Sequence, residues 1–222
     1  MEKSFVVAID GPAGAGKSSI AKIVAGKLGF SYIDTGAMYR AVTWKLQQTR
    51  QEFSPALAGE TARSMKISFK AEGELNRVYV DDAEVTEAIR SAGVTAEVSR
   101  VAAVGAVREA MVEQQRRMGS EGKVVLDGRD IGTVVFPRAD LKVFLTASVE
   151  VRALRRYKEL VAKGQSVELE QLQKDIAVRD KQDSERAISP LRQAEDAVYL
   201  DTSDLDIPQV VEAILKLVRE RS

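Results

Sequence analysis

Residues 11–18 (GPAGAGKS) fit the pattern G-x-x-x-x-G-K-[ST] in full. Glycines in such a run let successive backbone N–H groups turn toward a phosphate, and the helix N-terminus that follows adds a favourable dipole. Lys17 is placed to reach the outer phosphates, and the Ser18 hydroxyl is placed to coordinate magnesium. A glycine-rich turn that only joins a strand to a helix is the alternative, but the motif is complete. The run therefore predicts a nucleoside-triphosphate site.

A second group of charged residues follows an apolar run in the stretch VVLDGRDIGTVVFP, residues 124–137. Asp127 and Asp130 place two carboxylates around a glycine, and Arg129 lies between them. A salt-bridged surface turn is one interpretation of these charges. Ligands of open α/β sheets bind outside the carboxyl ends of strands, so the position of this group at a strand end favours a ligand site.

The composition limits which chemistry these residues can perform. The chain of 222 residues contains no histidine and no cysteine. This excludes an imidazole base, a Ser-His pair, a disulfide and a thiolate zinc site. The 33 basic and 33 acidic side chains balance, which argues against a broad surface for DNA or RNA. No apolar run is long enough for a membrane span and no signal-peptide pattern is visible, so a cytoplasmic protein is expected.

Strands and helices alternate along most of the chain. Short apolar runs at residues 5–9, 123–126, 141–145 and 197–200 predict buried strands. The helix after the glycine-rich run is predicted to close at Gly29. The last helix is predicted to begin at Asp206 as N-cap, with Pro208 in its first turn. This alternation predicts an α/β fold with a parallel sheet and right-handed crossovers.

Two segments interrupt this alternation. Residues 65–85 carry apolar side chains in steps of two, on either side of a turn at residues 72–74, which predicts a small antiparallel sheet. Residues 151–190 predict two polar helices around Gly164 that are rich in arginine and lysine. Charges at helical spacing are typical of a solvated face, so the pattern alone leaves the role of this segment open.

Among nucleoside-triphosphate binders, a small kinase fits the sequence best. A switch GTPase would carry an N-K-x-D-like tetrad, and the chain has none. Motor and AAA-type ATPases usually have longer chains and a strand that ends in acidic pairs. Leu126-Asp127 resembles the start of such a strand end, but Gly128-Arg129-Asp130 does not continue it.

The chain resembles the bacterial cytidylate kinase family in four stretches taken together. They are the motif at residues 11–18, YIDTGAMYR at 32–40, DGRDIGTVVFP at 127–137 and RDKQDSERAISPL at 179–191. The resemblance covers essentially the whole chain, and DGRDIGTVVFP is its most specific part. It implies a P-loop kinase fold: a five-stranded parallel sheet with helices on both faces, a small antiparallel insertion and a helical lid. It also implies transfer of the γ-phosphate of ATP to CMP or dCMP, with Mg²⁺.

The resemblance assigns residues to the donor nucleotide. The ATP-binding residues that it implies are Gly11, Pro12, Ala13, Gly14, Ala15, Gly16, Lys17, Ser18, Ser19 and Arg156. Ser18 is the expected magnesium ligand, and Asp127 is expected to support the phosphate and magnesium region.

The resemblance also assigns residues to the acceptor nucleotide. Arg40 and Arg129 are expected to hold its phosphate, because a guanidinium offers paired N–H donors that lysine cannot copy. Asp130 is expected to accept from the exocyclic amine of cytosine, with Ser99 and Arg108, on a predicted helix, serving the ring acceptors. Uracil presents a carbonyl instead, which would leave Asp130 repelled and unpaired. The implied acceptor residues are Thr35, Gly36, Arg40, Ser99, Arg108, Arg129, Asp130, Asp183 and Arg186.

Phosphoryl transfer depends mainly on positioning and on charge stabilisation. A phosphate oxygen is already an anionic nucleophile, so the reaction needs no histidine. The expected catalytic residues are Lys17, Arg129, Arg179 and Arg186. Arg155, Arg156 and Arg179 lie in the segment that resembles the lid. Arg179 is the expected contact to the transition state, and Arg156 is expected on the adenine side.

We expect a kinase core at residues 1–62 and 91–222, with the lid at about 151–190 and the acceptor-side β insertion at 63–90. The expected partners are ATP, CMP and dCMP, with no nucleic-acid polymer and no membrane, and the expected state is a monomer. Two other functions stay open. One is a kinase for another small acceptor such as UMP, and the other is an ATP-sensing binding protein without catalysis.

Overall fold

The computed structural model describes residues 4–73 and 75–222, and the chain divides into two compact units. The first unit takes the residues up to Tyr32 and those from Gly122 onward. The second unit takes Ile33–Glu121.

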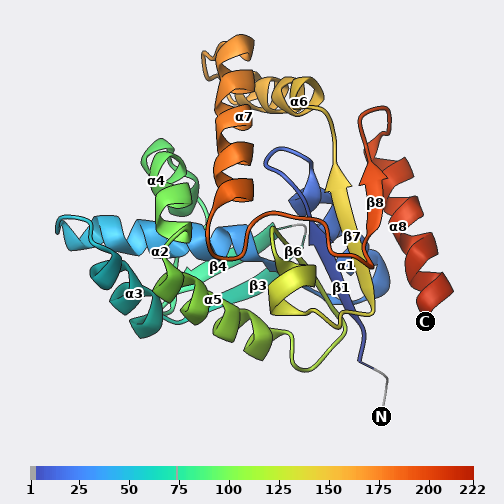
Figure 1. Cartoon of the computed structure of the whole chain (residues 1–222), viewed down its shortest axis with the longest axis horizontal. Coiled ribbons are helices and arrows are strands. Elements are labelled where there is room, and N and C mark those ends of the chain that lie inside the picture. Colours follow the sequence, from blue (N-terminus) through green and yellow to red (C-terminus); the bar gives the residue numbers. More distant parts are fainter. Residues whose placement is uncertain (1–3, 74) are drawn as a thin grey trace. The chain divides into compact units, whose positions relative to one another are not determined.

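A five-stranded sheet in the order β2-β6-β1-β7-β8 organises the first unit (Figure 1). β1 runs parallel to both β6 and β7, and β7 runs parallel to β8. This confirms the five-stranded parallel sheet and the α/β class. The strands are β1 (Val6–Asp10), β2 (Ser31–Asp34), β6 (Val124–Gly128), β7 (Leu141–Thr146) and β8 (Val198–Asp201).

Two helices that pack on each other, α1 (Lys17–Leu28) and α8 (Ile207–Arg221), flank this sheet. α1 ends at Gly29, which takes the left-handed conformation (φ 67°) predicted for a helix end. α8 begins at Asp206, whose side chain accepts from the backbone N–H of Gln209 in a capping box. Their apolar faces share one core with strands β1, β6 and β7.

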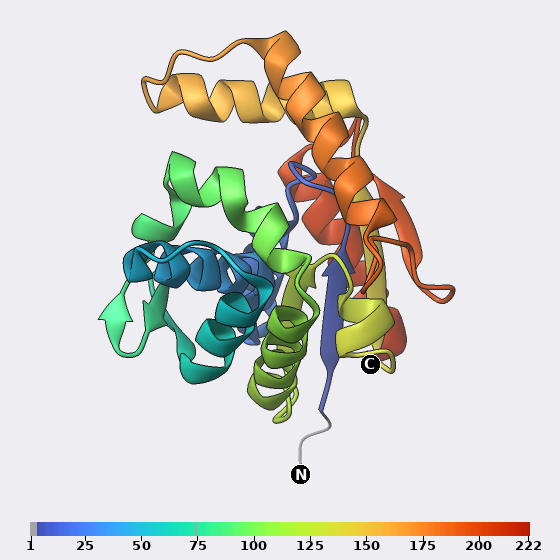
Figure 2. The same cartoon turned by 60° about the vertical axis from the view of Figure 1, so that its left-hand side comes forward.

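The two polar helices predicted around Gly164 are α6 (Val149–Ala162) and α7 (Leu169–Glu185). They pack against each other, and Figure 2 shows them crossing in the orange part of the chain. The turn between them contains Gly164 at φ 74°, a conformation that glycine adopts without strain.

The second unit contains helices and a small antiparallel sheet. Within it, α2 packs on α4, and α3 packs on α5. The predicted antiparallel sheet is present in the order β3-β4-β5, although Glu74, in its predicted turn, lies outside the described residues. The elements are α2 (Thr35–Thr49), α3 (Pro55–Ser64), β3 (Ile67–Glu72), β4 (Leu75–Val80), β5 (Ala83–Glu84), the 3₁₀ turn η1 (Ala88–Arg90), α4 (Ala92–Ala102) and α5 (Gly105–Met118).

One helix prediction in this unit is wrong. Ser99 and Arg108 were expected on a single helix, but Ser99 lies on α4 and Arg108 lies on α5. The chain turns at Ala103 and Val104, and Val104 takes an extended conformation (φ −72°, ψ 121°) just before Gly105. No proline marks this break, and the apolar periodicity of the sequence continues across it.

Helix α2 also contains the single tryptophan of the sequence, Trp44, which is half-buried. In the described part of the chain, no helix is both long enough and apolar enough to cross a membrane.

Candidate active site

The glycine-rich loop and the DGRD segment leave the sheet side by side. β1 and β6 are parallel neighbours, and Asp10 at the end of β1 lies opposite Gly128 at the end of β6. Gly11 begins the loop at φ 151°, and a Cβ at this position would lie 1.9 Å from the carbonyl oxygen of Leu145. Only glycine fits there, so the loop starts tightly against β7. Both predicted site segments therefore share the carboxyl edge of the sheet.

Lys17 lies at the start of α1 and is almost fully buried. Its Nζ donates to the carbonyl oxygen of Pro12, at 2.7 Å, within the same loop. Burial and the nearby positive charge of Arg129 lower the pKa of Lys17 to about 7, although Asp127 opposes that shift. An anion such as a phosphate bound beside Lys17 would favour its charged form.

Asp127, at the end of β6, accepts hydrogen bonds from two hydroxyl groups. Ser18 Oγ donates to its Oδ2 at 2.9 Å, and Tyr32 OH donates to its Oδ1 at 2.7 Å. Asp127 is buried, so these bonds fix the carboxylate beside the Ser18 hydroxyl. Oxygen donors of this kind suit Mg²⁺, which binds through one or two protein groups together with substrate phosphates. Among the described residues, no three acidic, histidine or cysteine side chains gather into a separate metal cage.

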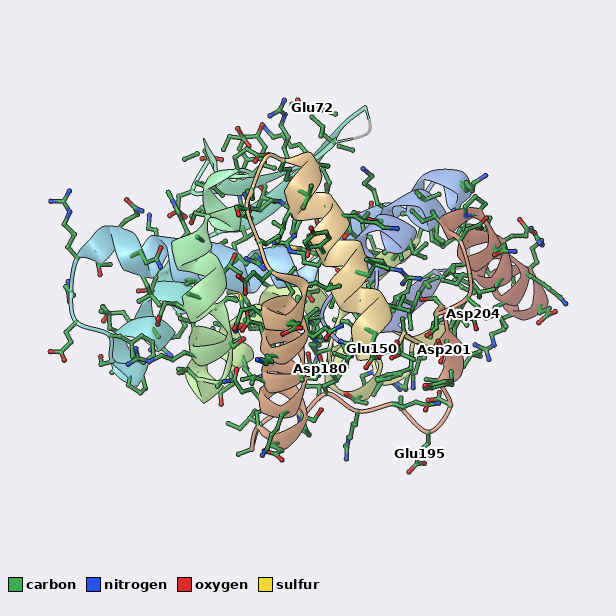
Figure 3. The ribbon with its side chains drawn as sticks, turned by 90° about the horizontal axis from the view of Figure 1, so that it is seen from above. Glu72, Glu150, Asp180, Glu195, Asp201 and Asp204 are labelled. Carbon is green, nitrogen blue, oxygen red and sulfur yellow. The ribbon has the colours of Figure 1, made fainter. Side chains whose placement is uncertain are left out.

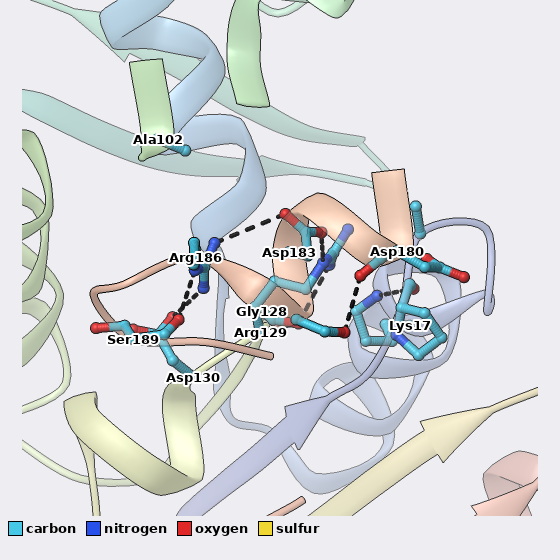
Figure 4. A network of polar contacts seen from close by, with 12 residues as sticks. Lys17, Ala102, Gly128, Arg129, Asp130, Asp180, Asp183, Arg186 and Ser189 are labelled. Atoms are coloured by element: carbon cyan, nitrogen blue, oxygen red, sulfur yellow. Dashed lines mark hydrogen bonds and ion pairs between the residues drawn. The ribbon is translucent and has the colours of Figure 1, made fainter. Parts of the chain in front are cut away.

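Arg129, Asp183 and Arg186 form one charged cluster (Figure 4). Arg129 Nε donates to Asp183 Oδ2 at 2.8 Å, and Arg186 Nη1 lies 3.7 Å from Asp183 Oδ1. Arg186 Nη2 lies 4.0 Å from Asp130 Oδ1, and its Nε donates to the carbonyl oxygen of Ser189 at 2.5 Å. The structure therefore brings four of the predicted acceptor residues together.

The charges in this cluster are mutually compensated. Burial alone would raise the pKa of Asp183, but Arg129, with Arg179 and Arg186, outweighs burial and holds that pKa below its ordinary value. Asp183 is therefore a carboxylate near neutral pH. It orients two guanidinium groups that an incoming phosphate could bind.

Asp10 has a role that the sequence did not reveal. Its Oδ1 accepts from the backbone N–H of Ile131 at 2.8 Å, and its Oδ2 accepts from that of Gly132 at 2.7 Å. Ile131 begins a π-helical turn, Ile131–Val135, directly after Asp130. Burial raises the pKa of Asp10 to about 6, against the effect of these two hydrogen bonds. An acidic residue that ends an otherwise apolar strand was the available signal.

In the second unit, the predicted acceptor residues gather around α2. Asp34 caps this helix, and Thr35 and Gly36 form its first turn, with Thr35 buried. Arg40 Nη1 donates to Thr95 Oγ1 on α4 at 2.9 Å. Ser99 follows Thr95 by one helical turn and therefore lies on the same face of α4.

Arg108 is buried near the beginning of α5. Its guanidinium lies over the ring of Tyr39 at 5.0 Å, and its Nη1 donates to the carbonyl oxygen of Ala102 at 3.1 Å. The second contact satisfies a carbonyl at the end of α4, so Arg108 also joins the two helices that the sequence merged.

The three arginines of the predicted lid have different surroundings. Arg155 binds Thr202 through two contacts, Nη1 to Oγ1 at 3.1 Å and Nη2 to the carbonyl oxygen at 2.6 Å. Arg156 pairs with Glu159 at 2.7 Å on the surface of α6. Arg179, on α7, is close enough to influence the pKa values of Lys17 and Asp183. Of the three, Arg179 is the one linked electrostatically to the predicted catalytic groups.

Comparison with known proteins identifies relatives across the full length of the chain. A family model described as cytidylate kinase matches residues 7–220. A cytidylate kinase of Exiguobacterium sibiricum is 52% identical over 97% of this chain and 97% of its own. A cytidylate kinase of Listeria welshimeri is 51% identical over 100% of this chain and 99% of its own.

Solved structures with lower identity share the fold. A gluconokinase of Sinorhizobium meliloti aligns with a TM-score of 0.51 at 15% identity, covering 98% of this chain and 94% of its own. An uncharacterized protein of Eubacterium ventriosum aligns with a TM-score of 0.55 at 11% identity, covering 98% of this chain and 99% of its own. Both matches concern the architecture alone.

Proposed function

Because the chain belongs to the cytidylate kinase family, we propose that it transfers the γ-phosphate of ATP to CMP or dCMP, giving CDP or dCDP and ADP. One observation supports this most directly. The loop that ends in Lys17 and the cluster of Arg129, Asp183 and Arg186 occupy the same edge of the sheet. The first group suits a triphosphate, and the second suits a monophosphate.

The residues divide between donor and acceptor. We propose that residues 11–19 bind the phosphates of ATP, with Lys17 neutralising the transferring group. Arg129 and Arg186 bind the acceptor phosphate, and Arg40 is a third arginine that we assign to this phosphate. Arg179 offsets the charge of the transition state, and Arg156 lies on the adenine side.

Cytosine recognition rests on three further residues in this proposal. Asp130 accepts from the exocyclic amine, while Ser99 and Arg108 donate to the ring acceptors. Asp183 binds the acceptor's sugar hydroxyl, and Thr35 and Gly36 shape the pocket at the start of α2. An acceptor without the amine leaves the buried Asp130 without a donor, which disfavours UMP.

The acceptor oxygen needs no base, because it already bears a negative charge. Catalysis then consists of holding the two nucleotides in line and excluding water. Ser18 and Asp127 supply the oxygen donors that we propose for Mg²⁺. When bound, this ion neutralises charge on the ATP phosphates.

A coupled assay of ADP release tests the proposal. Purified protein with ATP and Mg²⁺ is given CMP, dCMP, UMP, AMP or no acceptor, at equal concentrations. We expect CMP and dCMP to be converted much faster than UMP or AMP. Faster turnover of UMP would favour a different small-molecule kinase. ATP binding with no turnover of any monophosphate would favour a nucleotide sensor.

The monomeric state and the cytoplasmic location expected from the sequence also stay proposals. Sedimentation of the purified protein with and without ATP tests the first. Fractionation of the cells that express it tests the second.

A further inference from the structure

Arg152, in the first turn of α6, binds three separate segments of the first unit. Its Nε donates to the carbonyl oxygen of Ala147 at 2.8 Å, just before α6. Its Nη1 donates to the carbonyl oxygen of Ala13 in the glycine-rich loop at 2.9 Å. Its Nη2 lies 2.7 Å from Asp180 Oδ2 on α7. The side chain is almost fully buried, unlike the solvated arginines that a polar helix usually displays.

The contact to Ala13 acts on the phosphate-binding backbone. In a trans peptide the C=O and the following N–H point in opposite directions, and the described residues contain no cis peptide. Holding the Ala13 carbonyl on Arg152 therefore directs the Gly14 N–H away from α6. Gly14 has φ 76°, and a Cβ there would lie 3.3 Å from Arg152 Cβ. The loop thus rests directly on Arg152.

The contact to Asp180 acts on the second lid helix. Asp180 follows Arg179 directly and precedes Asp183, the partner of Arg129, by three residues. Figure 3 shows Asp180 on α7 and Glu150 at the start of α6, the helix end that contains Arg152. Asp180 Oδ1 is buried and lacks a hydrogen-bond partner within residues 4–73 and 75–222. Arg152 is therefore the ion-pair partner that the structure gives this carboxylate.

We propose that Arg152 is a positioning residue that sets two things together: the Gly14 N–H for a phosphate of ATP, and α7 with its Arg179. This inference rests on the proposed function, since it names how the ATP phosphates are received. Arg152 acts through Ala13 and Asp180 and touches no reacting atom. Three acceptors arranged around one planar guanidinium cannot be served by a lysine ammonium in the same way.

Variants of the two partners separate positioning from simple structural support. We would compare Arg152→Met, Arg152→Lys, Asp180→Asn and the double variant Arg152→Met/Asp180→Asn. The matched control is Lys158→Ala, an exposed cation on the same helix. Each protein is assayed well below its midpoint of thermal unfolding, so that loss of folded protein does not enter the result.

Binding is measured without turnover, by calorimetry with ATP, with inorganic tripolyphosphate and with CMP. We expect Arg152→Met to weaken ATP and tripolyphosphate alike by at least about tenfold, while CMP affinity changes less than about twofold. Arg152→Lys should fall between wild type and Arg152→Met. Lys158→Ala should match the wild type.

Turnover with CMP then tests the link to α7. We expect Asp180→Asn to lower kcat by about tenfold with ATP affinity nearly unchanged, because α7 loses its ion pair while Ala13 keeps its donor. The kcat of the double variant should be little lower than that of Arg152→Met alone, since both substitutions break the same ion pair.

Unchanged ATP and tripolyphosphate affinity in folded Arg152→Met would overturn the inference. If that variant does not fold, Arg152→Lys decides: wild-type affinity for ATP in this variant would equally overturn it. If the loss of kcat in the double variant equals the product of the two single losses, Asp180 acts independently of Arg152, which would contradict the proposed link. A wild-type protein that binds ATP but does not convert CMP would instead contradict the proposed function, and the binding measurements would still stand.

Discussion

The glycine-rich loop and the residues of the second unit that we assign to the acceptor are positioned in different ways. The proposed phosphate-binding groups of the loop come from one run of residues, 11–19, in which Lys17 is held by Pro12 five residues away and Ala13 by the distant Arg152. The acceptor residues come from three helices, and they are placed by contacts distant in sequence, such as Arg40 with Thr95. The proposed donor residues are therefore contiguous in sequence, whereas the proposed acceptor residues of the second unit depend on how α2, α4 and α5 pack.

This difference predicts distinct consequences of mutation. A change in the loop should weaken ATP and leave acceptor affinity in place. A change among the acceptor residues should do the reverse. Arg129, which we assign to the acceptor, directly follows β6 beside the strand that leads into the loop, so its replacement tests whether donor and acceptor effects are separable.

Replacement of Arg129 should give the largest effect. Arg129→Ala removes a guanidinium that we assign to the acceptor phosphate, and we expect kcat to fall by at least about 10³-fold. ATP affinity should remain nearly intact, because the loop keeps its own contacts. Coupled turnover and ATP calorimetry measure both, with the exposed Arg138→Ala as control. Wild-type turnover in Arg129→Ala would refute its assigned role.

Lys17→Met should give the next largest effect and the opposite split. Loss of the ammonium should lower kcat by about 10²- to 10³-fold. ATP should bind more weakly while CMP affinity stays unchanged, because the variant alters the loop alone. The exposed Lys27→Met, on the same helix, serves as control. Equal weakening of ATP and CMP would show that the two sites are not separable.

Asp130→Ala should change specificity more than rate. If Asp130 reads the cytosine amine, its removal should narrow the preference for CMP over UMP by about tenfold or more. The ratio of kcat/KM for the two acceptors measures this and serves as its own control. An unchanged ratio would place cytosine recognition elsewhere.

The smallest expected effect is the contribution of Asp10 to the pH dependence of folding stability. Its pKa is raised to about 6 in the folded protein, so between pH 6 and 4 the folded state binds a proton that the unfolded chain does not. The stability of the wild type relative to Asp10→Asn should therefore increase as pH falls, by about 1 kcal/mol from pH 6 to pH 5. Urea unfolding at both pH values measures it.

Asp81, in the second unit, is the matched control for this pH dependence. The backbone N–H of Lys66 and the ammonium of Lys45 hold the pKa of Asp81 below its ordinary value. Its contribution to stability is present above the unfolded pKa and is lost only as pH falls through the lowered folded value. Wild type and Asp81→Asn should therefore keep a constant difference between pH 6 and pH 5. A rise like that expected for Asp10 would contradict the assignment.

Local signals made much of the fold predictable. The strand and helix on either side of the motif at residues 11–18, the αL glycine at Gly29 and the cap at Asp206 each concern neighbours in sequence, and the structure confirms them. The break between α4 and α5 was not predictable, because it depends on tertiary packing and lacks a proline.

The contacts among the candidate residues were predictable where residue type and strand end coincide, as in Asp127 and Arg129. Asp10, Tyr32 and Arg152 were missed because their partners lie far along the chain. Arg152 meets Ala13 across 139 positions, and a sequence pattern of arginines on a polar helix does not single out the buried one. Family resemblance supplied the roles of Ser99 and Arg108, which their surroundings in sequence do not reveal.

Trp44 gives helix α2 an optical signal of its own. It follows Arg40 by one turn on the same helix, and the sequence holds no other indole. Fluorescence emission excited at this ring originates in the second unit, so a titration with cytidine monophosphate in the absence of ATP can be followed without any attached dye. The emission of Trp44 should not change when a ligand binds to the glycine-rich loop alone.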